Sequence, residues 1–467
     1  MLKVLFGEKG TNCAGVTRRS ALQVGGLGFG GLTLSNLMSA RAAGGSDLSR
    51  DTSVVWLWLN GGPTHIETFD PKMTAPVEYR SINGEVKTSI PGVTIGAQFP
   101  KLAKLANRMA FVRSFAHNVS SHGPAAELVA SGGNITKAAM SSLYARVVGT
   151  SHPQTGVPSN VVVPPLAAGP EYKGLEYDPT KRVTGVGTLP AHYRAFDPSV
   201  GSQLLDDMKL QLPQSRFGDR RVLLSGLDRI KRRLGENGTI DGVGRFQQQA
   251  FDVLLGGVSD AFDVSQEDPQ TIARYDTGHI RFSKATAASA SYIANSQPIA
   301  LGKQLLLARR LVEAGCGYVT VTSNNWDWHG PKHSVPIMLP VQGAAVDHAV
   351  SAFLEDLEDR GLSEKVLFIL TGEFGRTPRI NSRGGRDHWG NLCTLALAGG
   401  GLQMGQVIGE SDRLASRPAS DPVSLDNLLA TVMDTLFDRG LVRISQDRVP
   451  TNIANAIVAG EPIRQLG

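Results

Sequence analysis

Nearly continuous apolar runs recur along the chain, separated by segments with a helical pattern. They occupy residues 54–59, 111–115, 159–165, 317–322, 366–371 and 394–401. Runs of this length, rich in β-branched and aromatic side chains, are typical of strands buried on both faces of a parallel sheet. The pattern therefore predicts a sheet whose strands come from both halves of the chain.

Amphipathic segments alternate with these runs. The segment SSHGPAAELVASGG, residues 120–133, begins with serine at a capping position and ends at paired glycines, which predicts a helix. Similar patterns cover residues 299–315, 339–362 and 424–440. Strands that alternate with helices predict a three-layer α/β/α domain with a mostly parallel central sheet, spanning residues 50–467.

Residues 169–297 interrupt this alternation. Two stretches there, 220–238 and 243–257, have helical patterns, and no strand alternation is visible between them. We expect this region to be a mainly helical insertion, or cap, that lies outside the sheet.

The positive charge of the chain is concentrated at its N-terminus. The formal net charge is +5, yet the first 42 residues hold five basic residues and one acidic residue. The rest of the chain is close to neutral, so its charge gives no reason to expect a nucleic-acid partner.

The same segment, residues 1–42, is typical of an export signal. It contains the pair Arg18 and Arg19, a glycine-rich apolar stretch, and a small-x-small sequence at residues 40–42. The pattern resembles a bacterial twin-arginine signal, which implies the twin-arginine export machinery as a partner and a periplasmic or extracellular location. An uncleaved N-terminal anchor is the alternative. A membrane span needs about 20 solidly apolar residues. Because no other segment of the sequence is long and apolar enough, we expect no transmembrane segment after signal removal.

Two cysteines remain beyond this segment, Cys316 and Cys393, both next to apolar runs. Burial as small hydrophobic side chains is one reading, and a disulfide in an oxidising compartment is the other.

Polar side chains follow the predicted strands at the point where each strand ends. They are Asn60, His65, Asp70, His117, His122, Asp327, His329, Glu373 and Arg376, with Asp387 and His388 just before a later strand. Because the carboxyl ends of parallel strands meet at one edge of a sheet, these side chains are expected to converge. Imidazoles and carboxylates together suit a divalent metal ion such as Zn, Ca, Mg or Mn.

The stretch WDWHG, residues 326–330, gives the hypothesis of a metal site its most specific form. In an extended segment residues two apart point the same way, so Asp327 and His329 face one ion while Trp326 and Trp328 wall the other side. The alternative is that the carboxylate and the imidazole pair with each other without a metal.

Five motifs in this order resemble the domain-of-unknown-function family 1501, which is grouped with the alkaline phosphatase-like superfamily of sulfatases, phosphatases and phosphomutases. The motifs are WLWLNGGPTHIETFDPK, VRSFAHNVSSHGPAAELVASGG, WDWHG, GEFGRTPRIN and GGRDHWG, and the resemblance covers residues 53–436. It implies an alkaline phosphatase-like fold.

The resemblance also implies roles for particular residues. Ser121 stands where the superfamily has its nucleophile, Asp327 and His329 where it binds one metal, and Arg376 where charge on a transferring group could be stabilised. His388 resembles the final metal-binding histidine. His122 stands beside the nucleophile position, and we count it with Ser121 and Arg376 as a catalytic candidate.

This chain departs from the superfamily pattern at the second metal position. Asn60 replaces an acid there, and Glu373-Phe374 replaces an Asp-His pair. We therefore expect a weaker or altered second metal site. The residues that would substitute as ligands there are His65, Asp70, His117 and His122. The sequence contains no Cys-x-Pro-x-Arg or Ser-x-Pro-x-Arg signature, which argues against a formylglycine sulfatase.

These patterns predict an exported metal-dependent hydrolase that acts on sulfate or phosphate esters of a small molecule or a polysaccharide. The alternative is a non-catalytic secreted protein of the same fold that binds polysaccharide or a cell-surface partner. A metal-independent phosphomutase is disfavoured because no motif supports it.

We expect the exported protein to begin near Ala43, because cleavage is predicted after residues 40–42. N-terminal sequencing of the protein from its native cell checks this. Recovery of a cytoplasmic protein that still begins at Met1 would contradict the export hypothesis.

Overall fold

The computed structural model describes residues 48–172, 180–199 and 259–467. The chain divides into two units, Met1–Leu48 and Ser49–Gly467, and the description below concerns the second. The predicted export signal and the helices predicted at 220–238 and 243–257 lie outside the described residues.

A seven-stranded sheet forms the centre of this unit, in the order β11-β4-β10-β7-β1-β6-β5. Its strands are β1 (Ser53–Leu59), β4 (Met109–Val112), β5 (Asn160–Val163), β6 (Tyr318–Ser323), β7 (Val366–Thr371), β10 (Leu395–Gly399) and β11 (Gln406–Ile408). β10 runs antiparallel to both of its neighbours, and the other pairs are parallel. This confirms the predicted mostly parallel sheet.

The central strand β1 aligns the ends of its neighbours. Leu59 pairs with Ser323 of β6, and Trp58 pairs with Thr371 of β7. β4 is parallel to β7 because both are antiparallel to β10 between them. The four strands predicted to share one sheet therefore end at one edge, as expected.

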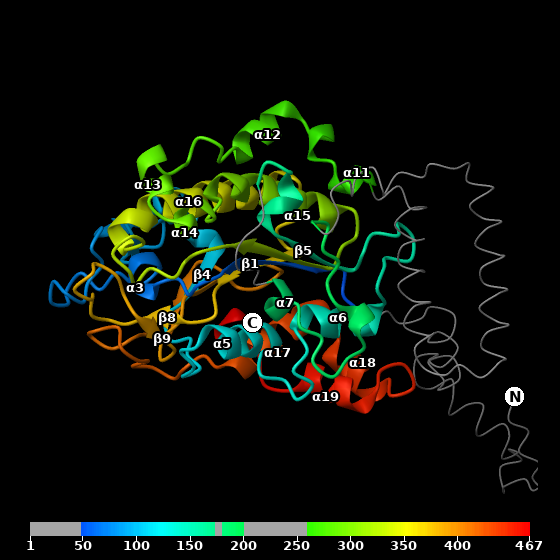
Figure 1. Ribbon diagram of the computed structural model, residues 1–467. Coiled ribbons are helices and arrows are strands. Elements are labelled where there is room, and N and C mark those ends of the chain that lie inside the picture. The colour runs from blue at the N-terminus through cyan, green and yellow to red at the C-terminus, as the bar shows by residue number, and fades with distance from the viewer. Residues whose placement is uncertain (1–47, 173–179, 200–258) are drawn as a thin grey trace, which may run out of the picture. The chain divides into compact units, whose positions relative to one another are not determined.

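Helices cover both faces of the sheet, as Figure 1 shows. One face carries α4 (Pro100–Lys104), α15 (Leu301–Glu313) and α16 (Val335–Asp359), and the other carries α5 (His122–Ser131), α6 (Met140–Val148), α17 (Leu425–Leu436), α18 (Arg439–Ile444) and α19 (Thr451–Val458). Along β1, Val55 and Leu57 belong to the core on the α15 and α16 side, while Trp56 lies near Tyr318 on the other, with ring centroids 6.5 Å apart. Both faces are buried, which explains why the sequence runs are continuously apolar.

Smaller elements complete the described unit. They are α3 (His65–Thr68), β2 (Glu85–Lys87) paired with β3 (Thr94–Gly96), η1 (Ala106–Arg108), η2 (Pro165–Ala168), η6 (Arg464–Leu466), and β8 (Gly375–Arg376) paired with β9 (His388–Trp389).

The helix α16 is long and apolar enough to cross a membrane by length and composition, which the sequence analysis did not anticipate. Most of its apolar window, 72%, is buried inside the protein. Its apolar side chains pack against α15 and the sheet, as in a core helix.

The regular elements in the described part of the predicted insertion are all short helices, joined by turns and irregular segments. Its elements are α7 (Thr180–Val183), η3 (Ala191–Tyr193), α11 (Ser259–Phe262), η4 (Val264–Gln266), α12 (Pro269–Tyr275), α13 (Lys284–Ala288), α14 (Ser291–Ala294) and, just past its end, η5 (Pro298–Ala300). Within these described parts it adds no strand, although Phe196 forms a single bridge to Val161 of the edge strand β5. Figure 1 shows α12 and α13 beyond α15 and α16.

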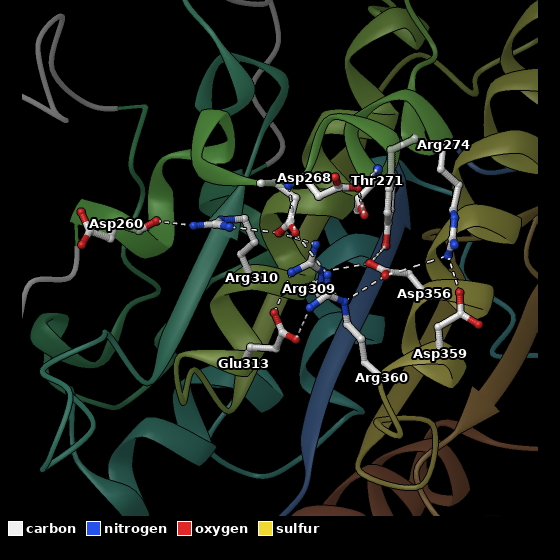
Figure 2. A network of polar contacts seen from close by, with 12 residues as sticks. Asp260, Asp268, Thr271, Arg274, Arg309, Arg310, Glu313, Asp356, Asp359 and Arg360 are labelled. Carbon is white, nitrogen blue, oxygen red and sulfur yellow. Dashed lines mark hydrogen bonds and ion pairs between the residues drawn. The ribbon is translucent and has the colours of Figure 1, made fainter.

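A network of charged side chains fastens this helical region to the domain (Figure 2). Arg309 of α15 is only 1% exposed, and it bonds to Asp356 at 2.9 Å, Glu313 at 2.6 Å and Glu267 at 2.6 Å. Arg360 reaches the same three carboxylates. A buried guanidinium needs such partners because an unpaired buried charge costs several kcal/mol.

Glu267 is the member of this network whose protonation is easiest to test. Partial burial alone would raise its pKa, but the hydrogen bond and charge of Arg309, with Arg310, outweigh burial and lower the pKa of Glu267 to about 2. A lowered pKa stabilises the fold above the unfolded-state value near 4.5, and this contribution is lost as the pH falls through 2.

We expect Glu267→Gln to lower the free energy of unfolding by about 2 kcal/mol at pH 7, because a charged hydrogen-bond acceptor is lost. The difference from the wild type should shrink as the pH falls below about 4.5. Urea unfolding at several pH values measures it, and Glu364→Gln, at an exposed position, is the matched control. A difference that is constant from pH 7 to pH 3 would contradict this assignment.

Candidate metal centre

Six predicted side chains gather at the edge where the strands end. They are His122 at the start of α5, Asp327 and His329 after β6, Glu373 and Arg376 after β7, and His388 on β9. The segments that carry them are far apart in the sequence, and the parallel strands bring them together.

The carboxylate of Asp327 is the hub of this cluster. Its Oδ1 accepts from His329 Nδ1 at 2.8 Å, from His388 Nε2 at 3.0 Å and from Arg376, while Oδ2 lies 3.4 Å from His122 Nε2. Burial alone would raise the pKa of Asp327, but the bonds from His122 and His388 and the charge of Arg376 hold that pKa well below its usual range. Asp327 is therefore an ionised carboxylate.

His122 links this hub to a second acid. Its Nδ1 lies 2.7 Å from Glu373 Oε1, which also accepts from the backbone N–H of Gly61 at 2.8 Å. Burial would lower the pKa of His122, but its bonds to Asp327 and Glu373 outweigh burial and raise that pKa to about 9. Two acids close to one imidazole make the cluster strongly attractive to positive charge.

Glu373 has an oxygen without a protein partner. Its side chain is 1% exposed, and its Oε2 has no hydrogen-bond partner among the described residues. A buried carboxylate oxygen is costly to leave unpaired. This orphaned oxygen indicates that the cluster is built to hold a cation or a ligand.

His388 is oriented as a metal-binding histidine would be. Its Nδ1 donates to the backbone carbonyl of Ser120 at 3.2 Å, and a metal ion would replace the hydrogen on Nε2 that faces Asp327. Such a bond from the far nitrogen commonly fixes the tautomer of a metal ligand. Ligand atoms of His122, Asp327 and His388 all lie within 4.8 Å of one another. This mixed nitrogen and oxygen set fits one divalent cation.

Arg376 holds the carboxylate of Asp327 from the protein interior. It is 1% exposed, and its guanidinium donates to the carbonyls of Gly61 and Gly62, to the carbonyl of Arg386 and to Asp327. The sequence-based role, stabilising charge on a substrate, does not match this geometry, because the guanidinium is turned to protein oxygens and away from solvent.

The backbone at Gly61 is part of the same support. Its φ is +116°, and a Cβ there would lie 2.5 Å from the backbone nitrogen of Asp327. Only glycine fits this close approach without a shift of the chain.

Arg386 anchors the segment that carries His388. Its guanidinium is fully buried and pairs with Glu67 at 3.0 Å, while it also donates to the carbonyls of Pro378 and Arg80. Its backbone N–H donates to Trp328, next to the hub. The strand bearing His388 is therefore fixed relative to Asp327.

The two tryptophans of WDWHG lie on the side away from the cluster. Trp326 and Trp328 are fully buried and stacked, with ring centroids 4.7 Å apart. Their indole N–H groups donate to Ser323 and to Gln342, respectively. Asp327 and His329 thus lie on one side and the two tryptophans on the other, as predicted. His329 Nδ1 pairs with Asp327 Oδ1 at 2.8 Å, however, which is the alternative to a shared ion, and the group that could hold a metal is His122, Asp327 and His388.

His65 and Asp70, proposed as ligands, are not brought into the cluster. The ring of His65 bonds to the carbonyl of Ala415, and burial lowers the pKa of His65 to about 4. Asp70 accepts from Ser411 and pairs with Lys72 and Arg113. Both line a separate small cavity beside β4 and β10.

Two further candidates, His117 and Asp387, also lie outside the cluster, and Asn60 contacts the segment before Asp327 through its backbone. His117 spends both ring nitrogens on protein, one on the carbonyl of Glu373 and one on the amide of Val119. Asp387 is 52% exposed and pairs with Arg383. Asn60 is buried, and its backbone carbonyl accepts from the backbone amide of Trp326.

Ser121 lies at the N-cap of α5, immediately before His122. It is exposed, and its hydroxyl makes no capping hydrogen bond. The hydroxyl of the neighbouring Ser120 instead accepts from the amide of Gly390 at 2.8 Å. Of these two serines, Ser121 has the hydroxyl that faces solvent without that constraint.

One contact was missed by the sequence analysis. The hydroxyl of Tyr292, on α14 of the insertion, accepts the backbone N–H of Asp327 at 2.9 Å. The ring of His333 packs at a tilt against that of Tyr292, with centroids 4.7 Å apart, and lies edge-on to His329 at 5.2 Å. No periodicity or motif marks Tyr292, so only the fold could reveal it.

A family model described as "Protein of unknown function (DUF1501)" matches residues 51–438. The chain belongs to this family. The match confirms the resemblance drawn from the five motifs. No curated protein matches the chain.

Solved structures similar to this DUF1501 chain include a sulfatase and a phosphonate monoester hydrolase. The PsFucS1 sulfatase from Pseudoalteromonas sp. is 14% identical, with a TM-score of 0.38 over 93% of this chain and 75% of that chain. The phosphonate monoester hydrolase SpPMH from Silicibacter pomeroyi is 10% identical, with a TM-score of 0.34 over 82% and 73%. At these scores the likenesses carry no argument about activity.

We expect Asp327→Ala and His388→Ala each to reduce the affinity for a divalent metal by roughly 100-fold or more, because a lost ligand exceeds the effect of a change beyond the ligands. His329→Ala is expected to act in the same direction. Asp387→Ala, next to His388 but turned to Arg383, is the matched control and should bind as the wild type does. Calorimetric titration with Zn²⁺ or Mn²⁺ measures this, and equal affinities for all variants would contradict the site.

Proposed function

We propose that this chain is a metal-dependent hydrolase of phosphate or sulfate esters. The observation that carries the proposal is the joint placement of Asp327, His122 and His388 around one point, with the buried Glu373 bonded to His122 and its Oε2 without a partner among the described residues. Four ionisable groups at one sheet edge are costly to assemble unless they bind a ligand.

The ligand atoms of His388, Asp327 and His122 would hold the ion, and Glu373 holds the ring of His122 through Oε1. A divalent cation, when bound, supplies a Lewis acid that lowers the pKa of a bound hydroxyl and neutralises charge on the transferring group. Arg376 keeps the carboxylate of Asp327 in place and ionised through its bond to Oδ1. The ion's identity, among Zn, Ca, Mg and Mn, is left to measurement.

Ser121 is the proposed nucleophile. Its exposed hydroxyl stands at the N-terminus of the ten-residue helix α5, where backbone N–H groups and the helix dipole favour an anionic group. The Ser121 oxygen would form a bond to phosphorus or sulfur as the bond to the leaving alcohol breaks. Water would then hydrolyse the resulting serine ester and return the hydroxyl.

A protein of this fold without turnover is the second candidate. The buried guanidinium of Arg376, committed to Gly61, Gly62 and Asp327, favours it, because no substrate oxygen would reach that charge. Under this reading the cluster binds metal and the chain binds a polysaccharide or a cell-surface partner.

We also propose that the protein acts after export, in the periplasm or outside the cell. The support is the sequence of residues 1–42, with Arg18 and Arg19 ahead of a glycine-rich apolar stretch.

We expect metal-loaded protein to hydrolyse an aryl phosphate or an aryl sulfate, and Ser121→Ala to lower kcat by roughly 1,000-fold or more, since the nucleophile is removed. Ser120→Ala, which loses only an acceptor for the amide of Gly390, should stay within a few-fold. A screen with each of the four metals tests both. Metal uptake with no turnover of either ester class would favour the second candidate.

A further inference from the structure

The helical insertion contributes a side chain to the metal centre. Tyr292 of α14 reaches the turn after β6, where its hydroxyl accepts from the amide of Asp327 at 2.9 Å. Its backbone carbonyl accepts from the side chain of Asn325. Two contacts to one turn hold the phenol beside the residue that forms the hub of the cluster.

The ring of Tyr292 is also fixed from its side. It packs at a tilt against the ring of His333, with centroids 4.7 Å apart and an interplanar angle of 35°. His333 in turn lies edge-on to His329 at 5.2 Å, and His329 lies edge-on to His388 at 5.5 Å. The phenol is thus the end of a row of rings that leads to the metal-binding residues.

A phenolic hydroxyl both accepts and donates a hydrogen bond. The amide of Asp327 uses the oxygen of Tyr292 as an acceptor, and the contacts within residues 48–172, 180–199 and 259–467 include no acceptor for the phenol's own hydrogen. A hydroxyl held away from bulk water normally finds a partner for that hydrogen. The partner here must be water or a bound ligand.

The surroundings favour a ligand oxygen. The charges of Asp327, Glu373 and Arg376 all act on the Tyr292 hydroxyl. Arg376 gives its N–H groups to protein oxygens, so it does not serve an anion at this edge. The phenol hydrogen is a neutral donor that can approach an anion beside two carboxylates without adding a buried charge.

We propose that Tyr292 is a substrate-binding residue, whose hydroxyl donates to a non-bridging oxygen of a tetrahedral phosphate or sulfate group held at the metal centre. This rests on the proposed function, because it assumes that such a group is bound beside Asp327. It gives the insertion a role in recognition, which a cap without side chains in the site would not have.

The test uses the full-length protein and compares wild type with Tyr292→Phe, which removes only the hydroxyl. Zn²⁺ is titrated first, by calorimetry, and inorganic phosphate and sulfate are then titrated separately into the metal-loaded protein. We expect the dissociation constant for the preferred oxyanion to rise roughly tenfold or more, as for a lost hydrogen bond to a charged group. The Zn²⁺ affinity should stay within about twofold.

Tyr318→Phe is the matched control. It also removes a buried phenolic hydroxyl, but from the start of β6, at the opposite edge of the sheet. It should change neither titration. The phosphate and sulfate arms together show which oxyanion the site prefers.

Equal oxyanion affinity in wild type and Tyr292→Phe would overturn the proposal. A parallel loss of Zn²⁺ affinity would also overturn it, because Tyr292 would then act only by positioning Asp327. Wild-type protein that takes up Zn²⁺ but binds neither oxyanion would defeat the proposed function itself, a result separate from the first two.

Discussion

The negative charge of Asp327 is the constraint on which the rest of the site depends. A carboxylate that is only 17% exposed stays ionised because the protein surrounds it with donors. Three imidazoles and one guanidinium do so. These donors come from four segments of the chain, namely the start of α5, the segment after β6, β8 and β9. The fold must bring all four segments to the carboxylate of Asp327.

That convergence explains features that look unrelated in the sequence. Gly61 must lack a side chain because the amide of Asp327 passes close to it, and its carbonyl, with that of Gly62, receives the guanidinium of Arg376. The buried pair of Glu67 and Arg386 fixes the segment that brings His388 to the same carboxylate. The turn at Gly61 and Gly62, the ion pair of Glu67 and Arg386, and the hairpin of β8 and β9 thus all help to surround the negative charge of Asp327 with donors.

Much of this arrangement could be predicted from the sequence. The strands could be recognised as continuous apolar runs, because strands such as β1 are buried on both faces. The ends of these strands then gave the edge of the sheet at which the site lies. The two-residue period placed Asp327 and His329 on one side. Distance from a strand end, however, does not give the direction of a side chain. His65 and Asp70 therefore entered the hypothesis although they turn to other partners, and Tyr292 was missed because its insertion has no strand rhythm.

The strand order also determines when the site can exist during synthesis. β1 ends at Leu59, yet its two neighbours end at Ser323 and Thr371, so the centre of the sheet waits for most of the chain to leave the ribosome. His388 follows later still. Pairings between such distant segments fold slowly and leave apolar strands uncovered for longer. The nascent chain therefore lacks the complete cluster of His122, Asp327 and His388, which forms only after the sheet has closed.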